Sequence, residues 1–292
     1  MLPPGIWDAA AIADKAIDYA ATFGAAGAVF FLGYGGSLIA SADRLSIRRV
    51  VLGSSMLSVA AGAVQIMVSA GSLGGEAAGM LDGSLIHIVW QAGAGRTNVI
   101  RAIGLLLAAI GASSDRPPWW ALLGAAMAAT SFAWAGHAHS LHPNLLPMLL
   151  IGVHLLAVAF WLGALAPLGI VARHGDVPRM AACAARFGSS AVFVVGGLMA
   201  AGLALLWMLL GDFNELWRSE YGRFVMLKLA FVAGLLGLAA FNKLRLTPRL
   251  QDGDSRALRS LRMSIGLESL LCVLILAVTA AFTTLTGPAA PG

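Results

Sequence analysis

The chain has 292 residues, of which 59% are hydrophobic and 11% are charged. Charged residues make up about a quarter of a typical soluble domain, so this composition excludes an ordinary soluble protein and predicts an integral membrane protein. The net charge of +5 does not indicate a nucleic-acid partner, because Lys and Arg fall between apolar runs and form no dense basic stripe.

The apolar runs predict membrane-crossing helices, each of which needs about 20 mainly apolar residues. Eight stretches qualify, at roughly 16–40, 48–70, 97–113, 119–137, 144–171, 188–210, 222–243 and 262–286. The gaps between them are too short to hold a separate folded unit. We therefore predict an all-α, polytopic integral membrane protein with eight transmembrane helices and a single membrane domain over residues 1–292.

Successive connections between membrane-crossing helices lie on opposite sides of the membrane, and Lys and Arg are distributed unevenly between these two sides. The connections after predicted helices one, three, five and seven hold thirteen: Arg44, Arg48, Arg49, Arg116, Arg173, Arg179, Arg186, Lys243, Arg245, Arg249, Arg256, Arg259 and Arg262. The other side, helix ends included, holds six: Lys15, Arg96, Arg101, Arg218, Arg223 and Lys228. The positive-inside rule makes the first side cytoplasmic and places both termini outside.

Between the second and third predicted helices, the apolar piece Leu85–Trp90 is too short to span a bilayer. We predict an interfacial or re-entrant segment on the outer side. It brings His87 to the same side as the histidines of the connection between helices four and five.

That connection carries Gly136-His137-Ala138-His139 and then His142. Side chains two residues apart share one side of an extended chain but not of a helix. His137 and His139 can therefore share an ion only if the helix ends near Gly136, which the following Pro143 favours. Imidazoles suit Cu(II), zinc, iron or nickel, and the methionines predicted on the same side suit Cu(I). We predict a metal entrance, the alternative being a polar loop whose histidines cap helices.

His154 is expected inside the fifth predicted helix. Ten residues from Asn144 correspond to about 15 Å of helix, close to mid-membrane, where polar side chains are costly and face the bundle interior or a cavity. Trp161, seven residues on, shares its face. We predict that His154 is a ligand or relay below the entrance, the alternative being a histidine hydrogen-bonded to a neighbouring helix for packing.

Arg101, Lys228 and Glu268 are further ionisable side chains that fall within the predicted spans. Arg101 and Lys228 lie one or two turns below the outer side, where both cations can instead extend to the interface. Glu268 lies about two turns above the inner side and is expected to pair with a basic group such as Arg262 or Lys243, or to act as an acid on the exit path. Cys272, one turn further, can bind Cu(I) beside it or fill space as a small apolar residue.

Several of these residues together resemble a known family. The motifs are Gly136-His137-Ala138-His139, the run His154–Gly163, Arg186-Phe187, Tyr221-Gly222 with Lys228, Asn242-Lys243 with Pro248, and Glu268. They resemble copper resistance protein D (CopD), a family of bacterial inner-membrane copper-handling proteins. The resemblance covers residues 131–288, and is looser over 16–137, where it rests on the helix layout and a Gly-rich outer segment leading to Arg101.

The resemblance implies that copper moves from periplasm to cytoplasm, with a periplasmic copper carrier of the CopC type as a partner. Ions would gather at His137, His139, His142 and His87 and pass His154, with Trp161, Arg101, Lys228 and Glu268 along the path. No nucleophile motif, phosphate loop or carboxylate pair indicates an enzyme. Two alternatives stay open: a haem-binding redox protein, and a partner that hands copper over without transporting it.

Overall fold

A computed structural model describes residues 5–134, 145–210, 217 and 220–285, and every regular element in these ranges is helical. The α-helices are α1 (Ile6–Gly35), α2 (Ser41–Gly74), α3 (Gly83–Val89), α4 (Gly95–Gly111), α5 (Trp119–Thr130), α6 (Leu145–His174), α7 (Val177–Leu210), α9 (Glu220–Phe241), α10 (Thr247–Gln251) and α11 (Ser255–Leu285). Gly36–Leu38, Ala77–Leu81 and Ser131–Trp134 form 3₁₀ turns, and Trp90–Ala94 and Asn242–Leu246 form π turns.

Within the described ranges, seven helical segments are long and apolar enough to cross a membrane. They are Ile6–Leu38, Ser41–Gly74, Gly83–Gly111, Leu145–His174, Val177–Met208, Gly222–Gln251 and Ser255–Leu285. The prediction of an all-α polytopic membrane protein is confirmed. The span predicted at 119–137 contains the 12 residues of α5 and the 4 of the following 3₁₀ turn, and it continues beyond the described residues. The total of eight spans stays a prediction.

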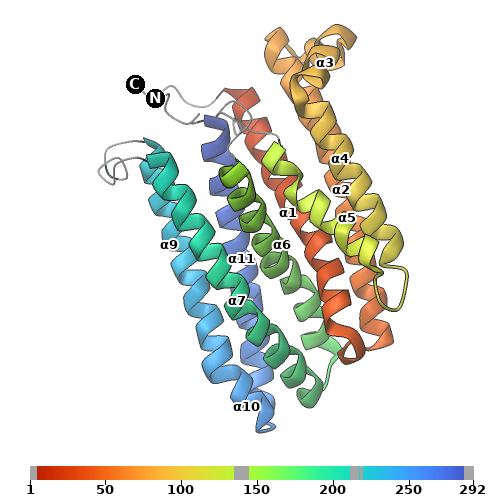
Figure 1. The fold of residues 1–292 in the computed structure, drawn as a ribbon, viewed down its shortest axis with the longest axis vertical. Coiled ribbons are helices and arrows are strands. Elements are labelled where there is room, and N and C mark those ends of the chain that lie inside the picture. The colour runs from red at the N-terminus through yellow and green to blue at the C-terminus, as the bar shows by residue number, and fades with distance from the viewer. Residues whose placement is uncertain (1–4, 135–144, 211–216, 218–219, 286–292) are drawn as a thin grey trace.

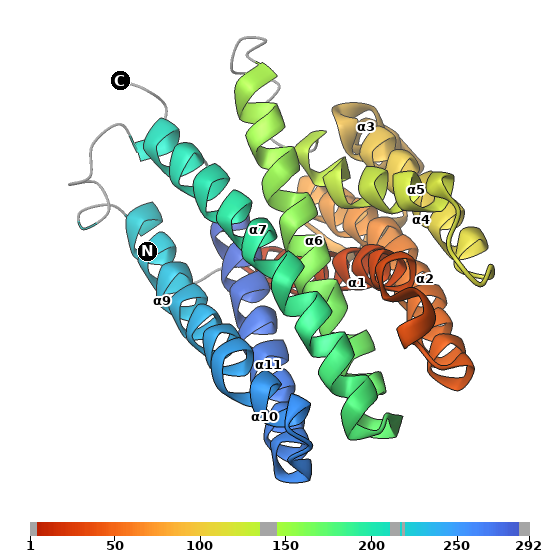
Figure 2. The same ribbon diagram turned by 60° about the horizontal axis from the view of Figure 1, so that its bottom comes forward.

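The long helices run up and down, so successive connections alternate between two ends of the bundle (Figure 1). The connections after α1, α4 and α6 lie at the same end as α10, which we call the α10 end, and α3 lies at the other, the α3 end. Figure 2 shows α2, α4 and α5 on one side of α1 and α6, and α9 and α11 on the other. The arginine-rich connections therefore share one end, as the alternation predicts.

Several cations at the α10 end bind carbonyl groups of other elements. Arg262 donates to the carbonyl oxygen of Ala172 in the last turn of α6 at 2.6 Å, and Lys243 donates to that of Gly188 in α7 at 2.8 Å. The last carbonyls of a helix have no partner within the helix and favour a nearby positive charge. These cations therefore hold neighbouring helices together and also make the α10 end positively charged.

α1 is the central helix and contacts α2, α4, α5, α6 and α11. It begins at Ile6, ten residues before its predicted start, so Asp14 lies inside it as well as Asp18. Its contact with α6 is a close approach of backbones, because Gly27 lies against Gly163 and the carbonyl of Ala159. Small residues permit such approaches where no hydrophobic force drives helices together in lipid.

Gly27→Ala is expected to lower the free energy of unfolding by about 1–3 kcal/mol, the usual cost of overpacking. The added methyl group would overlap backbone atoms of α6, which cannot rotate away. Gly53→Ala is the matched control, because a methyl group there meets nothing within 4 Å. Thermal unfolding in detergent measures both. Equal melting temperatures for the two variants would contradict this packing.

Candidate functional site

The predicted entrance is described only in part. His137, His139 and His142 lie outside the described residues. His87 lies in α3 with an exposed side chain, and its Nε2 is 2.8 Å from Nε2 of Gln91. Among the described residues, no group of three or more His, Cys, Asp or Glu side chains is placed to hold a metal ion.

The α3 segment that carries His87 is held at its start by Asp82. Its carboxylate accepts hydrogen bonds from the Ser84 hydroxyl and from the backbone N–H groups of Leu85 and Ser84. These bonds favour the ionised form, so they hold the pKa of Asp82 below its ordinary value. At its end, α3 turns into α4 through Gly93, whose φ of 101° lies in the left-handed region that glycine tolerates.

His154 lies in α6 and faces α7. Its Nδ1 is buried and has no hydrogen-bond partner in the described part of the chain. Gly202 of α7 lies opposite this nitrogen, because a methyl group placed on Gly202 would lie 3.8 Å from it, at ordinary van der Waals distance. Buried polar atoms are nearly always hydrogen-bonded. The packing alternative predicted a bond to a neighbouring helix, and no such bond forms at Nδ1.

Lys228 of α9 is the cation whose charge acts on His154. Its Nζ lies 5.8 Å from the ring centroid of Phe282 in α11, within the range of a cation–π contact. A positive charge beside an imidazole disfavours a second cation there. A charged Lys228 would therefore weaken cation binding at His154.

Trp161 points into the bundle, as the shared face with His154 predicts. Its side chain is 4% exposed and packs with Leu165 of α6, Leu235 of α9 and Cys272 of α11. Seven residues of helix separate it from His154 by about 10 Å. Trp161 and its apolar neighbours thus lie between His154 and the α10 end.

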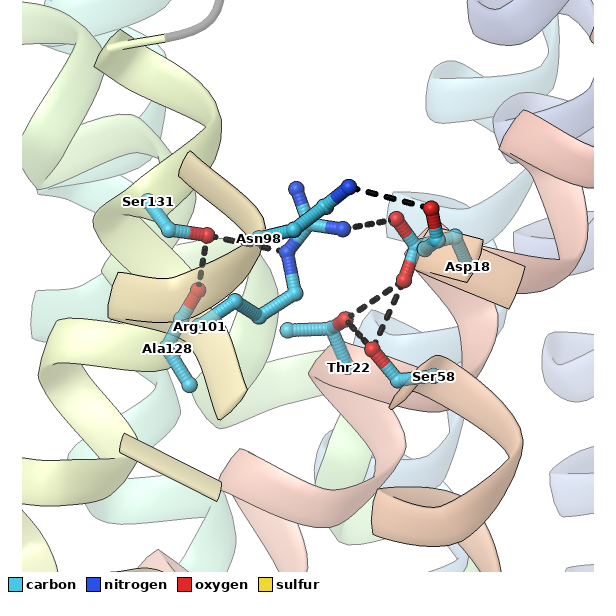
Figure 3. Close-up of polar contacts among 8 residues, drawn as sticks. Asp18, Thr22, Ser58, Asn98, Arg101, Ala128 and Ser131 are labelled. Atoms are coloured by element: carbon cyan, nitrogen blue, oxygen red, sulfur yellow. Dashed lines mark hydrogen bonds and ion pairs between the residues drawn. The ribbon is translucent and has the colours of Figure 1, made fainter. Parts of the chain in front are cut away.

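Arg101 does not extend to the interface but is buried in an ion pair with Asp18 of α1 (Figure 3), their side chains being 4% and 5% exposed. Its Nη1 donates to Oδ2 of Asp18, its Nε donates to the Ser131 hydroxyl at 3.1 Å, and its guanidinium lies 4.0 Å from the Phe132 ring centroid. Charged groups inside a membrane are rare and pair with one another. Arg101 thereby connects α4 to α1 and to the end of α5.

Sequence reasoning missed the carboxylates of α1. Oδ1 of Asp18 accepts hydrogen bonds from Ser58 of α2 at 2.7 Å and from Thr22 at 3.2 Å. Asp14, one turn earlier, is 8% exposed, and the charges of Asp18 and Arg101 both act on it. The four-residue spacing of Asp14, Asp18 and Thr22 was the available signal, because it places all three on one helix face.

Glu268 pairs with neither of the cations expected for it. The side-chain amide of Asn242, in the π turn after α9, donates to its Oε1, whereas Arg262 and Lys243 bind backbone carbonyls. Glu268 and Cys272 are 4% and 5% exposed. Both lie on the buried face of α11, but no third ligand joins them among the described residues.

A second pair that the sequence did not indicate lies at the α10 end. Nδ1 of His174, at the end of α6, is 3.1 Å from Oδ1 of Asp43 in the first turn of α2. Asp43 is 1% exposed, whereas the His174 side chain is 62% exposed. The pair joins the ends of two helices that are distant in sequence.

Two family models match the chain. One described as copper resistance protein D matches residues 181–282, and one described as copper resistance protein D-like, N-terminal domain matches residues 6–142. Residues 143–180, which include His154 and Trp161, lie between the two matched ranges. No curated protein and no solved structure matches the chain.

Proposed function

The chain belongs to the copper resistance protein D family, and from this premise we propose that it carries copper ions across the membrane from periplasm to cytoplasm. Family membership makes it a copper resistance membrane protein. The observation that supports transport most directly is the buried Nδ1 of His154, which has no hydrogen-bond partner in the described chain. A nitrogen ligand held free at this depth suits a transition-metal cation.

The proposed path has an outer and a middle station. Copper gathers at His137, His139 and His142, with His87 on the same side, and then binds His154. The nearby charge of Lys228 keeps that second site weak, and conduction requires sites that release their ion. Trp161 and Glu268 lie further along the path, toward the α10 end.

The proposed orientation places the α10 end in the cytoplasm of a bacterial cell, with the chain in the inner membrane. The arginine-rich connections at the α10 end support this orientation under the positive-inside rule. Both termini and α3 then face the periplasm, where a copper carrier of the CopC type would deliver its ion. We propose a transporter that catalyses no covalent reaction.

Copper uptake by sealed vesicles that contain the purified protein tests this function. Accumulation above that of protein-free vesicles is expected. Binding at the outer face without accumulation would instead support the hand-over alternative. A Soret band in the visible spectrum would favour haem, for which a facing pair of histidines is needed. The other two histidines that the structure describes lie elsewhere, His87 in α3 and His174 at the α10 end of α6, so we expect no Soret band.

Replacing both His137 and His139 with alanine is expected to weaken outer-face copper binding. The loss should reach at least the ~10–100-fold that removal of a supporting group costs a metal site. Titration of the intact protein with copper measures it, and His174→Ala at the α10 end is the control. Unchanged affinity in the double variant would place the entrance elsewhere.

A further inference from the structure

The outward half of α1 buries more negative than positive charge. Asp14 and Asp18 are 8% and 3% exposed, and Arg101 of α4, at 3%, is the cation that faces them. Lys15 is adjacent to Asp14 in sequence, but its Nζ lies 3.3–3.4 Å from oxygens of Thr283 and Thr284 in α11. With both carboxyl groups ionised, the cluster would carry one uncompensated negative charge.

The two carboxyl groups differ in their bonding. Both oxygens of Asp18 are engaged, Oδ2 by Arg101 and Oδ1 by Ser58 and Thr22. Asp14 accepts no hydrogen bond from any side chain or backbone group that the structure describes. The residue as a whole is 8% exposed, and its carboxyl oxygens are not among the fully buried polar atoms, so water can reach them. The charges that act on it are those of Asp18 and Arg101. The groups that α2, the end of α5 and α11 contribute to this cluster are uncharged: Ser58 bonds to Asp18, Ser131 to Arg101, and Thr283 and Thr284 to Lys15.

We propose that Asp14 is an exchangeable proton site, which takes up a proton from water at the periplasmic side and returns it there or to the transport path. An ionised carboxylate that is largely removed from water and lies one helical turn from a second carboxylate is costly, and such a group takes up a proton instead. A proton needs a single oxygen, whereas a metal ion needs several ligands and would have to displace the guanidinium from Asp18. The ion pair of Asp18 and Arg101 is the fixed part of this cluster, and Asp14 is the part that changes charge.

The position of the cluster connects Asp14 to the helix that carries His154. Asp18 and Arg101 connect α1 to α2, to α4 and, through Ser131, to the end of α5. α1 in turn packs against α6, which carries His154. A change of charge at Asp14 therefore acts on α1, the helix that joins this cluster to α6 and the proposed copper site. Proton exchange at Asp14 can in this way accompany copper movement. This coupling rests on the proposed transport, but the proton site does not.

Infrared titration of the purified protein, without copper, tests the site. Protonation of a buried carboxyl group produces a carbonyl stretch that grows as the pH falls, and one such group per chain is expected to disappear in Asp14→Asn. Glu268→Gln removes the other buried, incompletely paired carboxyl group and is expected to leave the Asp14 band in place. Asp14→Glu keeps a carboxyl group and should move the band without removing it, which identifies the site even if Asp14→Asn folds poorly.

An unchanged titration in Asp14→Asn, together with an unmoved band in Asp14→Glu, overturns the proposal. So does a band that sodium or potassium ions abolish at constant pH, because the site would then hold a monovalent metal ion. In vesicles, Asp14→Asn is expected to lose proton movement accompanying copper uptake. If the wild-type protein shows no copper uptake but still shows the Asp14 carbonyl band, the transport proposal is refuted and the proton site is retained.

Discussion

Replacing His154 with alanine is expected to lower copper uptake by at least about 100-fold while copper still binds at the outer face. Its Nδ1 is a buried nitrogen that no described group engages. Without it, a cation at this depth loses a ligand, and an uncompensated charge in the bilayer centre costs about 3 kcal/mol on insertion scales. Each ~1.4 kcal/mol added to a barrier slows a step about tenfold. Uptake by sealed vesicles, with copper binding measured on the same protein, separates passage from capture.

A second variant blocks the same nitrogen without removing it. Gly202→Leu extends from α7 toward His154, where the first added carbon already lies 3.8 Å from Nδ1. It is expected to reduce uptake as His154→Ala does. Gly196→Leu, on the same helix, is the matched control, because a methyl group there meets nothing within 4 Å. Normal accumulation of copper by His154→Ala vesicles would exclude His154 from the path.

Arg101→Met is expected to destabilise the protein by about 3–5 kcal/mol, the cost of removing one partner from a buried ion pair. The variant leaves Asp18 ionised in the bundle with only the Ser58 and Thr22 hydroxyls as donors. Asp18→Asn should cost a similar amount, because it leaves the guanidinium of Arg101 uncompensated. Thermal or denaturant unfolding in detergent measures both.

The double variant, Asp18→Asn with Arg101→Met, decides whether the two charges act as a pair. It is expected to recover much of the stability that each single variant loses, because neither charge is then left alone. Arg48→Met is the control. Its partner Asp115 at the α10 end is 99% exposed and Arg48 itself is 24% exposed, so this pair is in reach of water, where such pairs contribute about 0–1 kcal/mol. Simple addition of the two single losses would show that the ion pair is not the cause.

Hydropathy predicted where the chain crosses the membrane but not where helices begin. α1, α7 and α11 begin at Ile6, Val177 and Ser255, about seven to eleven residues before the starts predicted at 16, 188 and 262. The early turns carry polar residues, which lower the hydropathy of a window without preventing helix formation. Asp14 was therefore left outside the first predicted helix. Asp18 lay inside that helix but was not recognised as a partner for Arg101, because hydropathy does not show which helices pack together.

Composition and local motifs were enough to predict the all-α membrane class, the alternation of arginine-rich connections and the family. The sequence also placed His154 and Trp161 on one inward face, because helix periodicity relates residues seven apart. The tertiary structure alone decided that Arg101 pairs with Asp18, that Asn242 is the partner of Glu268 and that Gly202 faces His154. Those contacts join helices that are distant along the chain, and their pairing depends on how close backbones approach at residues such as Gly27 and Gly163, which periodicity within one helix does not specify.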